Sequence, residues 1–176
     1  MRYLTLVGRN LWIAVLALVV GLVSPTLARD LPGERASLAG LAGVNVLIEA
    51  MDPDVEPEGL ERSALQTDVE VKLRQAGVRV LTITESLVAP GSPYLYLRVT
   101  TVQADKVLPL YAVEIHLELN QEVMLARKPE IALVAPTWST SWVGAAGTKM
   151  LDRVRERVRD RVDEFINAYL AANPKR

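Results

Sequence analysis

The stretch LYAVEIHLELNQEVM, residues 110–124, alternates between apolar and polar side chains with a period of two. Successive side chains of a β-strand point to opposite faces of the sheet, so this period predicts a strand with one buried face. The odd-numbered residues from Tyr111 to Leu119 form the apolar face, and Glu114, His116 and Glu118 lie on the polar one. Because antiparallel sheets commonly bury one face and expose the other, the stretch predicts an antiparallel sheet covered on one side.

The flanking sequence predicts further strands at residues 44–48, 78–83, 94–102 and 131–143, and helices at 60–76 and 148–172. Leu65, Val69 and Leu73 repeat at helical spacing in the first helix, and the second also keeps an apolar stripe. The order is then β-α-β-β-β-β-α. It predicts an α+β two-layer sandwich, a mostly antiparallel sheet of about five strands with two helices on its apolar face. Since a helix crosses between the first two strands, we expect them to be parallel or separated by another strand.

Residues 1–28 have the order of a secretory signal peptide. Arg2 and Arg9 precede an unbroken apolar run, Leu11–Val23, and small residues ending at Ala28 follow. As a helix this run would be about 20 Å long, short of the roughly 30 Å hydrocarbon core of a bilayer. We therefore expect export to the periplasm of a Gram-negative-type bacterium and cleavage after Ala28; an uncleaved inner-membrane anchor facing the periplasm is the alternative.

Removing this segment leaves 148 residues and lowers the net charge from −1 to −3. Residues 29–40 are rich in Pro, Gly and charge and predict a flexible lead-in, followed by a single domain at 41–176.

The composition excludes several kinds of site. The chain has no cysteine, which rules out disulfides, zinc–thiolate sites, a thiol nucleophile and a lipid-modified cysteine. Its one histidine, His116, argues against a multi-histidine metal site, and its charge does not suggest a nucleic-acid binder. We therefore expect no cofactor, no metal and no nucleic-acid partner, and no catalytic constellation of the usual kinds.

The polar face of the 110–124 strand is the candidate binding surface. Glu114, His116 and Glu118 could hold a cation or act in acid–base chemistry, but same-face neighbours on one strand lie about 6–7 Å apart and cannot converge unaided. Trp138 and Trp142 share one face of the last strand. Without a bulge that face is the one that carries His116, whereas a bulge near Pro136 would turn both tryptophans into the core. The candidate surface comprises Tyr94, Tyr96, Arg98, Glu114, His116, Glu118, Trp138 and Trp142.

The junction between the last strand and the last helix is a weaker candidate. Residues 144–149, GAAGTK, lead from strand to helix, a context that can hold an anion, but their spacing differs from a P-loop. The five arginines between residues 153 and 161 alternate with acids, which predicts a solvated, ion-paired helix face.

The stretch GLERSALQTDVEVKLRQAGVRVL, residues 59–81, with the tyrosine-bearing and tryptophan-bearing strands after it, resembles small bacterial exported proteins of unknown function. As an architecture, the element order is similar to the lipopolysaccharide-assembly partner LptE and to auxiliary lipoproteins of lipid-transport systems. The resemblance implies two helices on an antiparallel sheet and a role in the cell envelope. The chain departs from those lipoproteins because it lacks the acylated cysteine.

The sequence thus favours a non-enzymatic binding or envelope-assembly module that docks a protein, peptide or lipid through a sheet face or edge. Two alternatives stay open: a small hydrolase or metal-dependent enzyme centred on His116, and an accessory subunit anchored in the inner membrane. Membrane contact is expected only through the N-terminal segment, if it is uncleaved.

Overall fold

The computed structural model describes residues 32–51, 60–105, 110–147 and 151–174. The fold is α+β, which confirms the predicted class. Along the chain its elements are α2 (Pro32–Ala36), β1 (Asn45–Ile48), α3 (Arg62–Gln75), α4 (Ile83–Val88), β2 (Tyr94–Asp105), β3 (Leu110–Leu125), β4 (Lys128–Gly147) and α5 (Leu151–Ala172).

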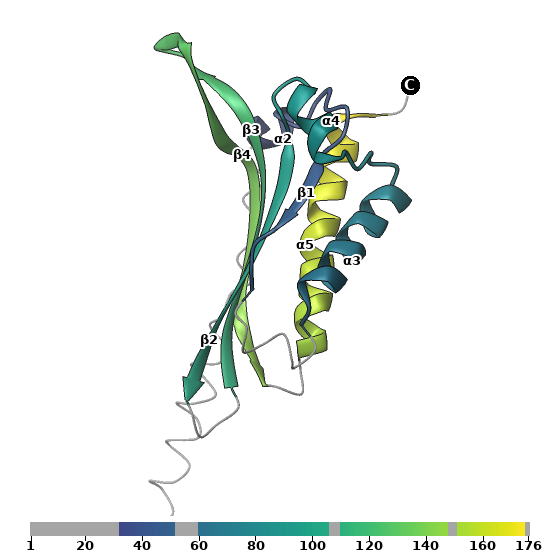
Figure 1. Ribbon diagram of the computed structural model, residues 1–176, viewed down its shortest axis with the longest axis vertical. Helices are drawn as coiled ribbons and strands as arrows, with labels where there is room; N and C mark the ends of the chain where they lie inside the picture. Colours follow the sequence, from purple (N-terminus) through teal and green to yellow (C-terminus); the bar gives the residue numbers. More distant parts are fainter. Residues whose placement is uncertain (1–31, 52–59, 106–109, 148–150, 175–176) are drawn as a thin grey trace, which may run out of the picture.

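The described strands pair in the order β1-β2-β3-β4 and form one mixed sheet (Figure 1). β1 runs parallel to β2, whereas β2, β3 and β4 are antiparallel neighbours. The sheet therefore has four strands where the sequence predicts about five. The parallel pair follows from the crossover through α3 and α4, which returns the chain to the end of the sheet at which β1 begins.

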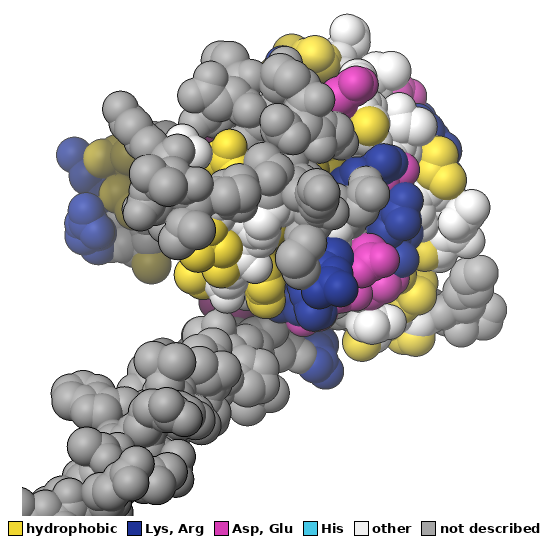
Figure 2. Space-filling model, turned by 90° about the horizontal axis from the view of Figure 1, so that it is seen from below, with side chains coloured by type: hydrophobic (Ala, Val, Ile, Leu, Met, Phe, Trp, Pro, Cys, Tyr) yellow, Lys and Arg dark blue, Asp and Glu magenta, His cyan; other side chains and the backbone are white. Residues whose placement is uncertain are grey.

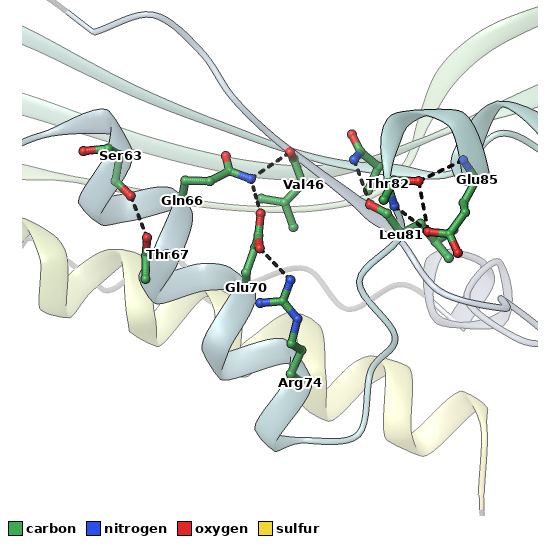
Figure 3. Close-up of polar contacts among 10 residues, drawn as sticks. Val46, Ser63, Gln66, Thr67, Glu70, Arg74, Leu81, Thr82 and Glu85 are labelled. Carbon is green, nitrogen blue, oxygen red and sulfur yellow. Dashed lines mark hydrogen bonds and ion pairs between the residues drawn. The ribbon is translucent and has the colours of Figure 1, made fainter.

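The missing strand is the segment 78–83, which the sequence predicts to be extended. It forms a single parallel bridge, between Val44 and Val80, and the N–H of Leu81 donates to the carbonyl of Val44 at 2.8 Å. A capping box then starts α4 (Figure 3). The Thr82 hydroxyl accepts from the Glu85 N–H at 3.2 Å, and the Glu85 carboxylate accepts from the Thr82 N–H at 2.8 Å. The helix therefore ends the strand after one bridge.

The hydrophobic core lies between the sheet and the helices α3 and α5, which cover the same face (Figure 1). The predicted alternation of β3 is confirmed: odd-numbered residues from Tyr111 to Leu119 are buried, and Glu114, His116 and Glu118 are partly exposed. α5 contributes a buried stripe that includes Val158, Val162 and Phe165. α3 and α5 thus cover the apolar face, as predicted. The described residues also form the short helices α2 and α4, which the sequence does not predict, so the predicted element order is wrong in detail.

α3 and α5 are also joined through polar side chains. The Asp68 carboxylate accepts hydrogen bonds from Arg155 at 2.8 and 3.2 Å and from Arg159 at 3.1 Å. Lys72 of α3 pairs with Asp163 of α5 at 2.8 Å. The basic helix face is therefore ion-paired, as predicted, but several of its pairs join two helices.

The folded domain begins upstream of residue 41. Leu38, placed by the sequence in a flexible lead-in, is fully buried in the core, and the Asn173 amide near the end of α5 donates to its carbonyl at 2.9 Å. The predicted signal peptide, 1–28, lies outside the described residues. No helix in the described part of the chain has the length and apolar character needed to cross a bilayer.

One hairpin extends past the rest of the sheet. β2 pairs with β3 only as far as Asn120, so residues 121–135 form a two-stranded hairpin arm that projects at one end of the molecule (Figure 1). Its base is held by the Glu122 N–H, which donates to the carbonyl of Gly91 at 2.8 Å. Beyond that base several apolar side chains face solvent, and Met124 is 71% exposed.

Candidate functional site

The face of the sheet opposite the helices is the open face, and it brings six of the eight predicted residues together. On β2 these are Tyr94, Tyr96 and Arg98, and on β3 they are Glu114, His116 and Glu118. The register pairs Tyr96 with Glu118 and Arg98 with His116. Side chains of directly opposed residues are neighbours on one face, so the six form a continuous patch.

Trp138 and Trp142 lie on the other face. The strands β3 and β4 shift register beside Thr137, so that Leu119 pairs with Trp138 and Ile115 with Trp142. Both tryptophans therefore share the face of the buried leucine and isoleucine. Trp138 is 4% exposed and its ring meets Phe165 edge-on, with the centroids 5.3 Å apart. Of the two arrangements that the sequence allows, the structure has the bulged one, and the tryptophans are removed from the candidate surface.

His116 is the centre of a short polar row on β3. Its Nε2 lies 3.0 Å from Oε2 of Glu118, and Oε1 of Glu118 accepts from the Asn120 amide at 2.8 Å. The side chains of His116 and Glu118 keep 26% and 21% of their surface exposed. The Glu118 carboxylate is thus held from both sides, which orients the imidazole at the surface of the patch.

Tyr96 is tied to the residue that directly follows β1. Its hydroxyl is hydrogen-bonded to Glu49, and this bond, together with burial and the negative charge of Glu49, raises the pKa of the Tyr96 phenol. Oε2 of Glu49 is buried and makes no hydrogen bond. Tyr96 is therefore held as a neutral hydrogen-bond donor. Glu49 is not among the surface residues predicted from the sequence, although the alternation of β1, with Val46 and Ile48 buried, places it on the open face.

Apolar side chains flank the polar patch on three strands. Leu47 of β1 pairs with Tyr96, Val102 continues the open face of β2, and Val143 of β4 pairs with Glu114. These three side chains are 41%, 60% and 63% exposed. The open face therefore combines two tyrosines, charged groups of both signs and exposed aliphatic groups, a mixture typical of protein interaction surfaces.

The outer edge of β4 is partly occupied. The carbonyl of Thr137 accepts from the Ser37 hydroxyl at 3.2 Å, and that of Ser141 accepts from Arg161 at 3.4 Å. A strand that added to this edge would have to displace both side chains. The face is therefore more accessible to a partner than this part of the edge.

Within the described ranges, no group of three or more His, Asp and Glu side chains has the arrangement to hold a metal ion. No known family model matches this chain, and a comparison with curated proteins finds no significant relative.

Proposed function

We propose that this protein is a non-enzymatic binding module of the bacterial cell envelope, exported to the periplasm, that docks a partner through the open face of its sheet. The observation that carries the proposal is the two-sided sheet. α3 and α5 cover one face, and on the other six predicted surface residues lie together with no described element packed over them (Figure 1).

The chemistry of the patch supports a protein or peptide partner. Tyr94 and Tyr96 offer rigid, amphipathic contact area, and Arg98 offers a guanidinium on the same face, opposite His116 in the register. The occupied carbonyls at Thr137 and Ser141 favour docking on the face over addition of a strand to the β4 edge. An envelope lipid is the other partner class that the proposal includes.

The test is site-specific photo-crosslinking in cells. A photoreactive residue substituted at Arg98, on the open face, should crosslink to one partner at a fixed stoichiometry of partner to protein. The same residue at Val71, an exposed position on α3, is the matched control and should capture none. A Tyr94→Ala change that abolishes the Arg98 crosslink would show that the patch makes the contact. Equal capture from Arg98 and Val71 would contradict the proposal.

The location is tested separately. Export with cleavage after Ala28 predicts that N-terminal sequencing of the periplasmic protein begins at Arg29. Recovery of an intact Met1 in the membrane fraction would instead favour the anchored accessory subunit.

One observation favours a second candidate, a small hydrolase. Ser141 is the cross-strand partner of His116, which itself contacts Glu118 at 3.0 Å, so a hydroxyl, an imidazole and a carboxylate are neighbours on the open face. His116→Ala and Ser141→Ala should each abolish such an activity without unfolding the protein. If both variants retain full function in cells, the hydrolase candidate is excluded.

A further inference from the structure

A cavity of about 430 Å³ opens between the end of β4 and the first turns of α5. This is the end of the molecule seen in Figure 2, where Lys and Arg side chains lie beside acidic and hydrophobic ones. The cavity is on the helix-covered side of the sheet, separate from the open face. Its walls are formed by Trp142, Ala145, Ala146, Arg153, Val154, Glu156 and Arg157.

The Trp142 ring forms part of this wall and has neighbours on β4 and α5. It lies so close over Gly144 that a Cβ at that residue would overlap the ring. On α5, the guanidinium carbon of Arg157 is 5.7 Å from the ring centroid, and Nη1 of Arg157 donates to Asp160 at 3.0 Å. Glycine at 144 thus lets the ring lie along the strand, and the ring and Asp160 together position the Arg157 guanidinium.

Arg153 differs from the other arginines of α5. Arg155 and Arg159 bind Asp68, Arg157 binds Asp160, and Arg161 binds Glu164. No carboxylate among the described residues forms an ion pair with Arg153. Residues four apart on a helix are neighbours on its surface, so Arg153 and Arg157 present two guanidinium groups to one cavity.

We propose that this cavity binds a small monocarboxylate that carries an apolar group. Guanidinium groups match the planar geometry of a carboxylate and bind it through paired hydrogen bonds. The apolar part would lie against Trp142, Ala146 and Val154, which are apolar and partly or fully buried. The Glu156 carboxylate in the same wall disfavours a doubly charged anion.

The experiment is an NMR titration of the full-length protein with benzoate. The indole N–H signal of Trp142 is identified by its loss in Trp142→Phe. Benzoate should shift this signal saturably and leave the other indole signals of the chain in place. Arg153→Gln and Arg157→Gln should each weaken binding about tenfold or more, because each removes hydrogen bonds to a charged group. Arg127→Gln, the same charge change in the hairpin arm, should leave the affinity unchanged.

Two further ligands define the class. Benzamide, which has the ring without the charge, should bind at least about tenfold more weakly than benzoate, and so should inorganic phosphate. The proposal is overturned if benzoate gives no saturable shift, if benzamide or phosphate binds as well as benzoate, or if Arg153→Gln binds benzoate as tightly as Arg127→Gln does. Dispersed amide signals in each variant show that it is folded, so a lost shift reports on the site.

Discussion

Phe165→Ala should be among the most destabilising single changes in α5. Phe165 is fully buried, and its ring packs against Trp138 with centroids 5.3 Å apart and against Tyr169 at 6.2 Å. Truncation of a buried phenylalanine to alanine typically costs about 3–5 kcal/mol, from lost burial and the remaining cavity. A domain of this kind has a free energy of unfolding of only about 5–15 kcal/mol, so the loss would be a large part of the total.

Urea denaturation followed by far-UV circular dichroism and tryptophan emission measures this effect. With a slope near 2 kcal/mol per molar urea, a loss of about 4 kcal/mol lowers the midpoint by about 2 M. Leu170→Ala is the matched control, because Leu170 lies on the same helix and is 38% exposed, and it should cost under about 1 kcal/mol. Equal losses in the two variants would refute the packing of α5 on the tryptophan face of β4.

Three further predictions concern polar contacts and one glycine. In the same urea assay, Asp68→Asn should lower the free energy of unfolding by about 1–3 kcal/mol, because it weakens the hydrogen bonds from Arg155 and Arg159. Asp163→Asn, at the more exposed ion pair with Lys72, should lower it by less than about 1 kcal/mol. The hydrogen bonds from the backbone and side chain of Thr82 lower the pKa of Glu85 from its ordinary 4.5. The ionised Glu85 carboxylate therefore adds to the free energy of unfolding at neutral pH, and this contribution is lost as the pH falls through the lowered pKa. The Tm difference between wild type and Glu85→Gln should therefore shrink below about pH 4.5; a pH-independent difference would contradict this linkage. Gly144→Ala should displace the Trp142 ring, which a change in its indole N–H signal would report. The same variant should lower the free energy of unfolding by about 1–3 kcal/mol.

The periodic elements could be predicted from the sequence because burial on one face imposes a period. The alternation of β3 and the helical stripe around Leu65 and Val69 each reflect one covered side, and both are observed. The apolar run of residues 78–83 alone predicts a full strand, but the Thr82–Glu85 capping signal that follows it ends the extended segment. That signal is in the sequence and would have located the start of α4.

The position of the tryptophans could not be settled from the sequence. A bulge adds one residue to one strand and leaves composition and periodicity on both sides intact, so Pro136 was the only local indication of it. The alternation of β2 and β3 therefore predicts the six patch residues correctly, whereas the prediction for Trp138 and Trp142 is wrong. The cavity beside Trp142 cannot be predicted from the sequence either, because it depends on the orientation of the Trp142 ring over Gly144.

The pairing of β1 with β2 has a consequence for the order of folding. β2, β3, β4 and α5 follow one another along the chain and can associate through short connections, whereas Asn45 must find Tyr94 across the whole α3 and α4 region. Closing such a long loop costs entropy before any contact forms, so pairings of this kind tend to form late. We expect the amides of β3 to gain protection before those of β1 in pulse-labelled hydrogen exchange during refolding. β1 would then be the last strand to dock, and the edge of β2 would stay exposed in a newly made chain until β1 pairs with it.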